Sequence, residues 1–265
     1  MTQTIATDVT TILLDLDDTI LQDDAATDVA FEATARHAEH VAGVDPERLI
    51  GEVRRISAEI WEGGPFPDWL DGIGTSEIEG LRARFEGDDP HWAEMREWGP
   101  GFRRESWRRA LAACGVENDE LAANLDARFE HERAHTNPFV PGGEEALATL
   151  GERFRLGIVT NGIPDVQRTK MEKTGLSDRF ETIIVSGELG FGKPDPEIYD
   201  AALRGIGATP GETIMVGDNF RRDVTAAQSV GIRGVWISIG RPSPDPSVTP
   251  WLTIETLAEL PDHLK

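Results

Sequence analysis

The sequence predicts an α/β fold: a sandwich around a parallel β-sheet, with an all-helical module inserted after the first strand. Short runs rich in Ile, Leu and Val indicate strands buried on both faces, and the later runs are separated by helix-like segments. Strands that alternate with helices are joined by right-handed crossovers and form a parallel sheet. Between the first and second runs, about 140 residues instead repeat apolar side chains at helical spacing, which indicates an insertion.

Each expected strand is an apolar run between polar or turn-forming residues. The runs that predict strands are Thr11–Leu14, Phe154–Val159, Thr182–Val185, Thr213–Val216 and Gly234–Ile237. The segments that predict core helices are Glu144–Leu150, Val166–Thr174, Glu197–Leu203 and Asp223–Val230.

The inserted module is expected to span residues 22–136, which leaves residues 1–21 and 137–265 for the α/β core. A turn-rich linker, His135–Gly143, follows it. Five of the seven tryptophans lie in the module, where they either pack its core or line a substrate cavity. Its helices are predicted from apolar residues that share one face, namely Leu49, Val53, Ile56 and Ile60; Ile78, Leu81 and Phe85; Trp107, Leu111 and Cys114; and Leu121, Leu125 and Phe129.

The chain is strongly acidic: 48 Asp and Glu against 26 Lys and Arg give a formal net charge of −22 and a pI near 4.6. Nucleic acid is therefore not an expected partner. The acidic residues are scattered and only four basic residues are lysine, a pattern that resembles proteins from salt-loving organisms. Salt weakens the self-repulsion of such a chain, because the Debye length falls to about 3 Å at 1 M. We hypothesise halophily; a merely acidic mesophilic protein is the alternative.

The sequence also bears on location. Residues 1–10 hold no Lys or Arg and no apolar run like that of a signal peptide, and no stretch approaches the roughly 18 apolar residues of a membrane span. The only cysteine, Cys114, cannot form an intramolecular disulfide, which is consistent with a reducing compartment. We expect a cytoplasmic protein without a membrane partner, whose oligomeric state the sequence leaves open.

Candidate catalytic residues follow the first strand. Asp15 and Asp17 stand two residues apart where the chain leaves the strand, so both side chains face one side while Leu16 faces away. The carboxyl ends of parallel strands lie at one edge of a sheet, so polar clusters near later strand ends are expected to converge on Asp15. These clusters are Thr160-Asn161-Gly162, Lys193 in a Gly- and Pro-rich loop, and Gly217-Asp218 followed by Asp223.

This combination fits phosphoryl transfer through an aspartyl-phosphate. Asp15 is the expected nucleophile, and Asp17 is expected to protonate the leaving oxygen and then to activate water. Mg²⁺ is expected to neutralise the phosphate, with Asp15 and Asp218 as natural ligands.

The remaining polar residues are assigned to the phosphoryl group and its surroundings. Thr160 supplies a hydroxyl, Asn161 an amide and Lys193 an ammonium for the phosphoryl oxygens. Asp223 either caps a helix or supports the site by holding a metal-bound water or Lys193. Asp18 has no expected role.

In this order the motifs resemble those of the haloacid dehalogenase superfamily of hydrolases. The resemblance implies a Rossmann-like core, and the helical insert resembles the mobile cap of the subgroup with small-molecule phosphatases and 2-haloacid dehalogenases. It also implies Mg²⁺ bound by the Asp15 carboxylate, the backbone carbonyl of Asp17 and Asp218, and a flap near Ile20–Ala25 that helps the cap to close. The matching segments are Asp15-Leu16-Asp17-Asp18-Thr19-Ile20, Thr160-Asn161-Gly162, Lys193-Pro194, and Gly217-Asp218 with Asp223.

Asp17 separates the reactions open to such a chain. Dehalogenases of the family need no metal and lack the second aspartate, because a halide has no oxygen to protonate. Asp17 therefore favours hydrolysis of a small phosphorylated metabolite. A phosphomutase would share all four motifs and stays an alternative; a non-catalytic binding module would be expected to lack Asp15, Asp17 or Lys193, and all three are present. The run around Lys193 is similar to phosphatases of nucleotides, sugar phosphates or phosphoglycolate, without choosing among them.

Overall fold

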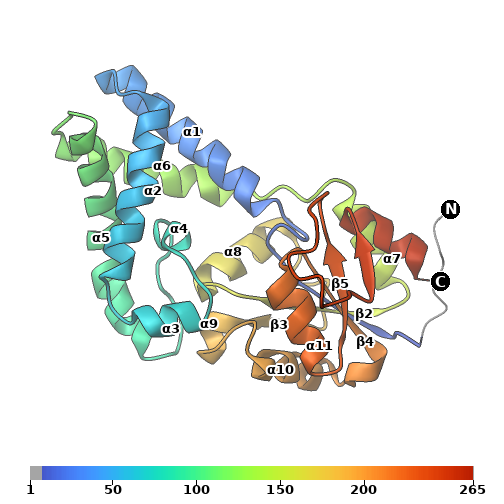
Figure 1. The fold of residues 1–265 in the computed structure, drawn as a ribbon. Coiled ribbons are helices and arrows are strands. Elements are labelled where there is room, and N and C mark those ends of the chain that lie inside the picture. The colour runs from blue at the N-terminus through green and yellow to red at the C-terminus, as the bar shows by residue number, and fades with distance from the viewer. Residues whose placement is uncertain (1–7, 265) are drawn as a thin grey trace.

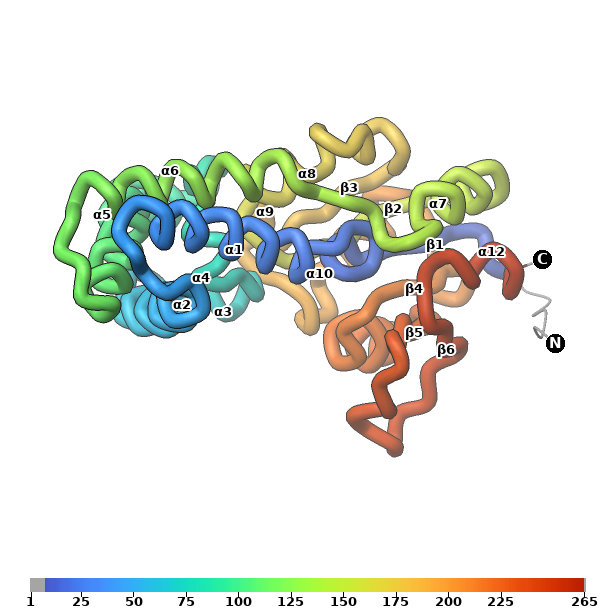
Figure 2. The backbone as a smooth tube through the Cα atoms, turned by 90° about the horizontal axis from the view of Figure 1, so that it is seen from above, coloured from blue at the N-terminus to red at the C-terminus, as the bar shows by residue number. Residues whose placement is uncertain are grey.

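A six-stranded, all-parallel sheet forms the centre of the α/β core in the computed structural model, which describes residues 8–264. Its strand order is β3-β2-β1-β4-β5-β6, which places β1 between β2 and β4 (Figures 1 and 2). The strands are β1 (Thr11–Leu14), β2 (Arg155–Thr160), β3 (Thr182–Val185), β4 (Thr213–Gly217), β5 (Arg233–Ile237) and β6 (Leu252–Ile254). The five predicted strands are confirmed; β6, an edge strand of three residues, is too short to give a pattern.

Both faces of this sheet are buried, as the unbroken apolar runs predict. Leu13 packs on one side of β1 with residues of the helices after β3 and β4, whereas Ile12 and Leu14 pack on the other side. The core helices are α7 (Gly143–Gly151), α8 (Pro164–Thr174), α9 (Ser186–Leu189), α10 (Pro196–Ile206), α11 (Ala226–Ser229) and α12 (Leu260–His263). Short 3₁₀ turns at Pro210–Glu212 and Leu257–Glu259 complete this part.

The helix predicted at Asp223–Val230 differs from the structure. The helical stretch begins earlier, with a π-helical segment at Phe220–Thr225, and only Ala226–Ser229 is α-helical. The start is set by Asn219, whose side chain accepts the backbone N–H of Arg222 at 3.0 Å. Asp223 thus lies inside the first helical turn rather than at its beginning.

Six helices between β1 and α7 form the cap, which lies beside the core away from both chain ends (Figures 1 and 2). They are α1 (Asp23–Ala42), α2 (Pro46–Glu62), α3 (Pro67–Gly72), α4 (Glu77–Gly80), α5 (His91–Ala113) and α6 (Asp119–His135). The division of the chain at residues 22 and 136 stays a prediction. None of the helices in residues 8–264 is both long and apolar enough to cross a membrane.

Aromatic side chains fill the centre of the cap. Trp61, Trp92 and Trp107 are buried there, and Trp69 and Trp98 pack against the same cluster. None of these five tryptophans lines the cavity that contains Asp15, which favours the packing interpretation over the substrate-binding one.

One predicted helical face in the cap is wrong. Ile78, Leu81 and Phe85 do not share a helix, because α4 ends at Gly80 and Phe85 has a left-handed φ of 58°. Gly80, the last residue of α4, packs so tightly on Trp61 that a Cβ would lie 2.3 Å from its ring. Turns, rather than a helix, therefore bury Leu81 and Phe85 in the cap centre.

The loop between α3 and α4 is seated directly on the core. The hydroxyl of Ser186 donates to the carbonyl of Ile73 at 2.6 Å, and the backbone N–H of Gly192 donates to the carbonyl of Gly72 at 3.0 Å. On the same side, Trp92 Nε1 donates to the carbonyl of Gly187 at 2.9 Å. These bonds hold the cap against the loop that carries Lys193, so cap residues can take part in a site at the sheet edge.

Candidate active site

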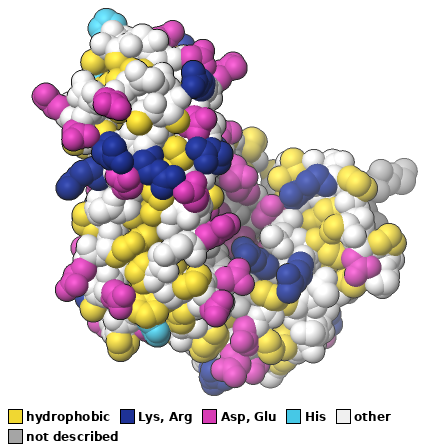
Figure 3. Space-filling model, turned by 60° about the vertical axis from the view of Figure 1, so that its left-hand side comes forward, with side chains coloured by type: hydrophobic (Ala, Val, Ile, Leu, Met, Phe, Trp, Pro, Cys, Tyr) yellow, Lys and Arg dark blue, Asp and Glu magenta, His cyan; other side chains and the backbone are white. Residues whose placement is uncertain are grey.

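A cavity of about 390 Å³ lies at the carboxyl edge of the sheet, beneath the cap. Six of the predicted site residues line it together: Asp15, Asp17, Thr160, Asn161, Lys193 and Asp218. The seventh, Asp223, is fully buried behind Lys193. A recess edged by acidic side chains separates the two parts of the molecule in Figure 3.

Lys193 is held between two carboxylates. Its Nζ donates to Asp15 Oδ1 and to Asp223 Oδ1, each at 2.7 Å, and the side chain is buried. Burial alone would lower the pKa of Lys193, but Asp15 and Asp223 together raise it, so the ammonium stays charged. Burial raises the pKa of Asp15 to about 7, partly offset by Lys193 and reinforced by Asp223.

Asp223 reaches Lys193 because the residue at the end of β4 is glycine. A Cβ on Gly217 would lie 2.2 Å from Asp223 Oδ2, so any side chain there would push the carboxylate away. The same oxygen accepts the backbone N–H of Asn219 at 3.0 Å. Asp223 therefore holds Lys193, and its supporting role in the reaction stays a prediction.

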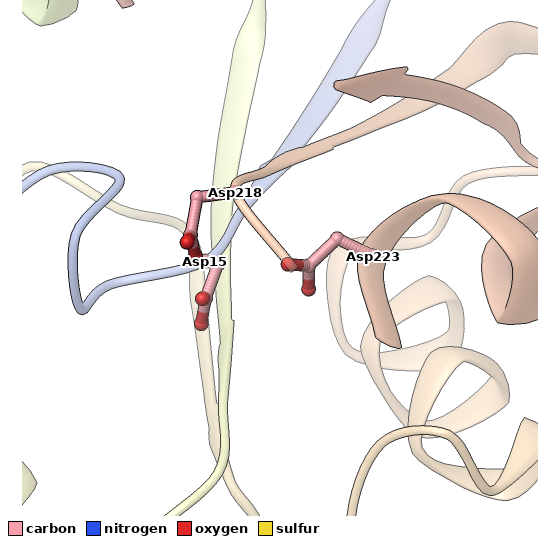
Figure 4. A group of neighbouring side chains, drawn as sticks. All are labelled: Asp15, Asp218 and Asp223. Atoms are coloured by element: carbon pink, nitrogen blue, oxygen red, sulfur yellow. The ribbon is translucent and has the colours of Figure 1, made fainter. Parts of the chain in front are cut away.

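Three carboxylates gather at the ends of β1 and β4. Ligand oxygens of Asp15, Asp218 and Asp223 all lie within 4.8 Å of one another, and Figure 4 shows Asp15 and Asp218 side by side with Asp223 on the adjacent helix. Such an all-oxygen donor set fits a hard divalent cation, and three carboxylates around one ammonium leave an excess of negative charge. Burial, followed by Asp15, raises the pKa of Asp218.

Asp17 is held by two side chains of helix α8. Its Oδ1 accepts Lys170 Nζ at 2.7 Å and its Oδ2 accepts Gln167 Nε2 at 2.8 Å. Lys170 is almost fully buried and also lies 2.7 Å from Asp23 Oδ1, at the start of α1. The carboxylate of Asp17 is thus oriented by the core, and its partner is shared with the cap.

Two further cations from the cap lie beside Asp23, close to Lys170. Arg133 of α6 pairs with Asp23, and Arg82 lies 3.4 Å from the same oxygen. Lys170, Arg133 and Arg82 hold the pKa of Asp23 well below its usual range, although burial by itself would raise it. A buried ionic cluster therefore joins α1, α6 and α8 beside the cavity.

Thr160 and Asn161 are engaged within the core. Thr160 Oγ1 accepts Gln167 Nε2 at 3.0 Å. The Asn161 side chain pairs with the backbone of Lys193 in both directions, accepting its N–H at 2.7 Å and donating to its carbonyl at 2.8 Å. In the structure Asn161 ties two loops together; a contact to a phosphoryl group stays a prediction.

The turn after Asp17 gives Asp18 a role that the sequence does not reveal. Asp18 adopts a left-handed φ of 54°, which Asp tolerates better than most residues, and its Oδ1 accepts the N–H of Asp24 at 3.2 Å. It thereby caps the first turn of α1, whose own N-cap residue, Gln22, provides no side-chain bond. The segment predicted as a flap, Ile20–Ala25, accordingly runs into α1 at Asp23.

Sequence reasoning misses several polar side chains near the cavity, among them Lys170, Gln167, Glu79 and Arg222. Lys170 carried a signal, because lysine is rare in this chain and lies one turn after Gln167 on the helix that follows Thr160. The sequence gives no such signal for Arg222 or Glu79, because a charged residue in a loop or cap helix is ordinarily solvated.

Comparison with known proteins gives a consistent result. Residues 9–231 match the family model described as haloacid dehalogenase-like hydrolase. The chain is similar to a protein named phosphoserine phosphatase from Thermus thermophilus, with 36% identity over 94% of this chain and 96% of that protein. It is also similar to pyrimidine 5'-nucleotidase YjjG from Escherichia coli, with 30% identity over 73% and 76% of the two chains.

Among solved structures, a 2-haloacid dehalogenase from Pseudomonas syringae matches over 96% of this chain and 97% of its own. The identity is 25% and the TM-score is 0.60. The match shows that the α/β core and helical cap form one known arrangement.

Proposed function

This chain is a phosphatase of the haloacid dehalogenase-like hydrolase family, and we propose that it hydrolyses a small phosphorylated metabolite with Mg²⁺ through an aspartyl-phosphate on Asp15. The observation that carries the proposal is the convergence of Asp15, Asp17 and Lys193 in one cavity. Two carboxylates beside a buried ammonium suit attack on a phosphoryl group followed by hydrolysis.

In the first step, a carboxylate oxygen of Asp15 forms a bond to phosphorus while the bond to the leaving oxygen breaks. Asp17 gives its proton to that oxygen. In the second step, Asp17 takes a proton from water, whose oxygen attacks phosphorus as the bond to Asp15 breaks and inorganic phosphate leaves. Lys193, fixed by Asp223, stabilises the charge that spreads over the phosphoryl oxygens.

The residues that would hold Mg²⁺ are Asp15 and Asp218 with the backbone carbonyl of Asp17. When bound, the ion offsets the repulsion between the Asp15 carboxylate and a phosphate dianion. Thr160 and Asn161 would orient the phosphoryl oxygens.

Asp17 distinguishes this reaction from dehalogenation. It lines the cavity, where Lys170 and Gln167 orient it; displacement of a halide requires no proton-transfer group. The similarity to a solved dehalogenase concerns the fold.

The test is hydrolysis of p-nitrophenyl phosphate with Mg²⁺ or with EDTA, by the wild type and Asp15→Asn. We expect activity that requires both Mg²⁺ and Asp15. Release of halide from a 2-haloacid without metal, or hydrolysis that survives Asp15→Asn, would refute the proposal. Because a relative is named phosphoserine phosphatase, L-phosphoserine is the first metabolite to assay.

We further propose that the protein works in the cytoplasm and at high salt. Support comes from the single cysteine, which cannot form an intramolecular disulfide, and from the net charge of −22.

A further inference from the structure

The cap contributes its own residues to the reaction cavity. Gly74, Thr75, Ser76 and Glu79, from the loop and helix α4 seated on the core, line the same space as Asp15 and Asp17. The volume of about 390 Å³ is that of a small-metabolite site. The cap residues therefore border the space that a substrate would fill.

More acidic residues line the cavity than the proposed reaction uses. Two basic residues, Lys193 and Arg222, line it against seven acidic ones: Asp15, Asp17, Asp18, Asp23, Asp24, Glu79 and Asp218. Within residues 8–264, Asp15, Asp17, Asp23 and Asp218 each have a cationic partner within 4.0 Å. In the same described residues, the carboxyls of Asp18, Asp24 and Glu79 have no cation within 4.0 Å. Of these three, Glu79 lies on α4, which follows the cap loop seated on the core.

Glu79 lies beside the residue that handles protons. A Cβ on Gly162 would lie 2.5 Å from Glu79 Oε1 and 2.8 Å from Gln167 Nε2, so Glu79 and Gln167 meet at this glycine. Gln167 is the side chain that donates to Asp17 Oδ2. Asp17 protonates the leaving oxygen in the proposed reaction, and Glu79 is linked to Asp17 through Gln167 in the same cavity.

The carboxyl of Glu79 accepts hydrogen bonds from two neutral partners. Its Oε2 accepts the hydroxyl of Thr75 at 2.5 Å, and its Oε1 accepts the N–H of Ile163 at 3.4 Å. Neither partner is charged. Burial raises the pKa of Glu79 to about 7, with Lys170 partly offsetting the rise, so a cation beside it would restore the charged carboxylate and be held in return.

We infer that Glu79 is a specificity-determining residue that binds an ammonium group on the leaving part of the substrate. The preferred substrates are phosphate monoesters of amino alcohols, including zwitterionic amino acids. Leaving groups that carry only negative charge gain no such partner in Glu79. This inference rests on the proposed phosphatase function and names its substrate class.

The experiment compares substrates that differ only in the amino group. O-phosphoethanolamine is paired with ethyl phosphate, and L-phosphoserine with 3-phosphooxypropionate, at one Mg²⁺ concentration and one ionic strength. For the wild type we expect kcat/KM to be at least about tenfold higher on the aminated member of one pair.

The matched variants are Glu79→Gln and Glu77→Gln. The first removes the charge but keeps the size of the side chain; the second changes a neighbour on α4 that lines a different cavity. We expect Glu79→Gln to lower kcat/KM on aminated substrates roughly 10–100-fold, mainly through KM, and to lower kcat/KM on p-nitrophenyl phosphate much less. Glu77→Gln should change neither.

The outcomes separate this inference from the proposed function. Equal wild-type activity within both pairs, or an equal loss on p-nitrophenyl phosphate in Glu79→Gln, would overturn the role of Glu79 while the phosphatase proposal stands. If the wild type does not hydrolyse p-nitrophenyl phosphate with Mg²⁺, the proposed function fails first. The wild-type comparison decides the substrate class even if Glu79→Gln does not fold.

Discussion

Lys170 is the side chain through which the core orients its proton-transfer residue. Its ammonium bridges Asp17 and Asp23 at 2.7 Å each, and almost none of it is exposed to water. A buried charge with two carboxylate partners has little freedom to move, so it fixes the oxygen of Asp17 that it binds. Lys170 therefore acts on the reaction by positioning Asp17.

Replacing Lys170 with methionine should impair proton transfer selectively. We expect kcat on an alkyl phosphate to fall about 10–100-fold with little change in KM, because general acid–base assistance is lost. With p-nitrophenyl phosphate the first step, seen as the burst of p-nitrophenol, should slow much less, since p-nitrophenolate leaves without a proton. Lys173→Met, an exposed change on the same helix, is the control. An equal slowing of the first step on both substrates would indicate general damage to the site rather than misplacement of Asp17.

At the scale of elements, the first residue of α1 ties the cap to the core. The carboxylate of Asp23 forms ion pairs with Lys170 of α8, with Arg133 of α6 and with Arg82, which follows α4. Three cations therefore share this one carboxylate as a partner. Their attraction keeps Asp23 ionised to low pH. Removing one partner of a buried ion group leaves the others uncompensated, which is costly.

Asp23→Asn should lower the free energy of unfolding by about 3–5 kcal/mol at neutral pH. The folded-state pKa of Asp23 is depressed, so its contribution is present above the unfolded pKa of about 3.9 and is lost as pH falls below it. The difference in the free energy of unfolding between wild type and variant, measured by urea denaturation, should therefore become smaller at acidic pH. Asp24→Asn, in the same helical turn, should show little loss, and a gap that is independent of pH would contradict this role of Asp23.

Whether these elements can be predicted from the sequence depends on how far apart in the sequence their contacting residues lie. Strands buried on both faces leave continuous apolar runs, and parallel strands share one carboxyl edge, so the sheet and the meeting of Asp15 with Lys193 were predictable. The turn at Gly80 and the contact of Glu79 with Gly162 were not, because each depends on a segment distant in sequence that packs against it.

For the whole molecule, charge is the dominant property. Acidic side chains are spread over both parts of the face in Figure 3, and they also line the cavity. At low ionic strength this distribution opposes both compaction and the approach of an anionic substrate.

Salt should therefore stabilise the protein and improve substrate binding together. We expect the melting temperature to rise between low salt and molar KCl, by roughly 2–4 °C for each kcal/mol gained, and KM to fall over the same range. Potassium chloride and sodium chloride should act alike, which separates screening from specific binding of either cation. A melting temperature that does not change with salt would contradict halophily.

The most direct measurement is to trap phosphate on Asp15. In Asp17→Asn, p-nitrophenyl phosphate still transfers its phosphoryl group, because its leaving group needs no proton, but water is no longer activated. Rapid quenching and mass spectrometry should then find one phosphoryl group on the peptide that contains Asp15, together with a burst of p-nitrophenol, and should find neither when Asp15 is also changed to asparagine. A phosphoryl group on another residue, or turnover with no covalent phosphate at any time, would contradict nucleophilic catalysis by Asp15.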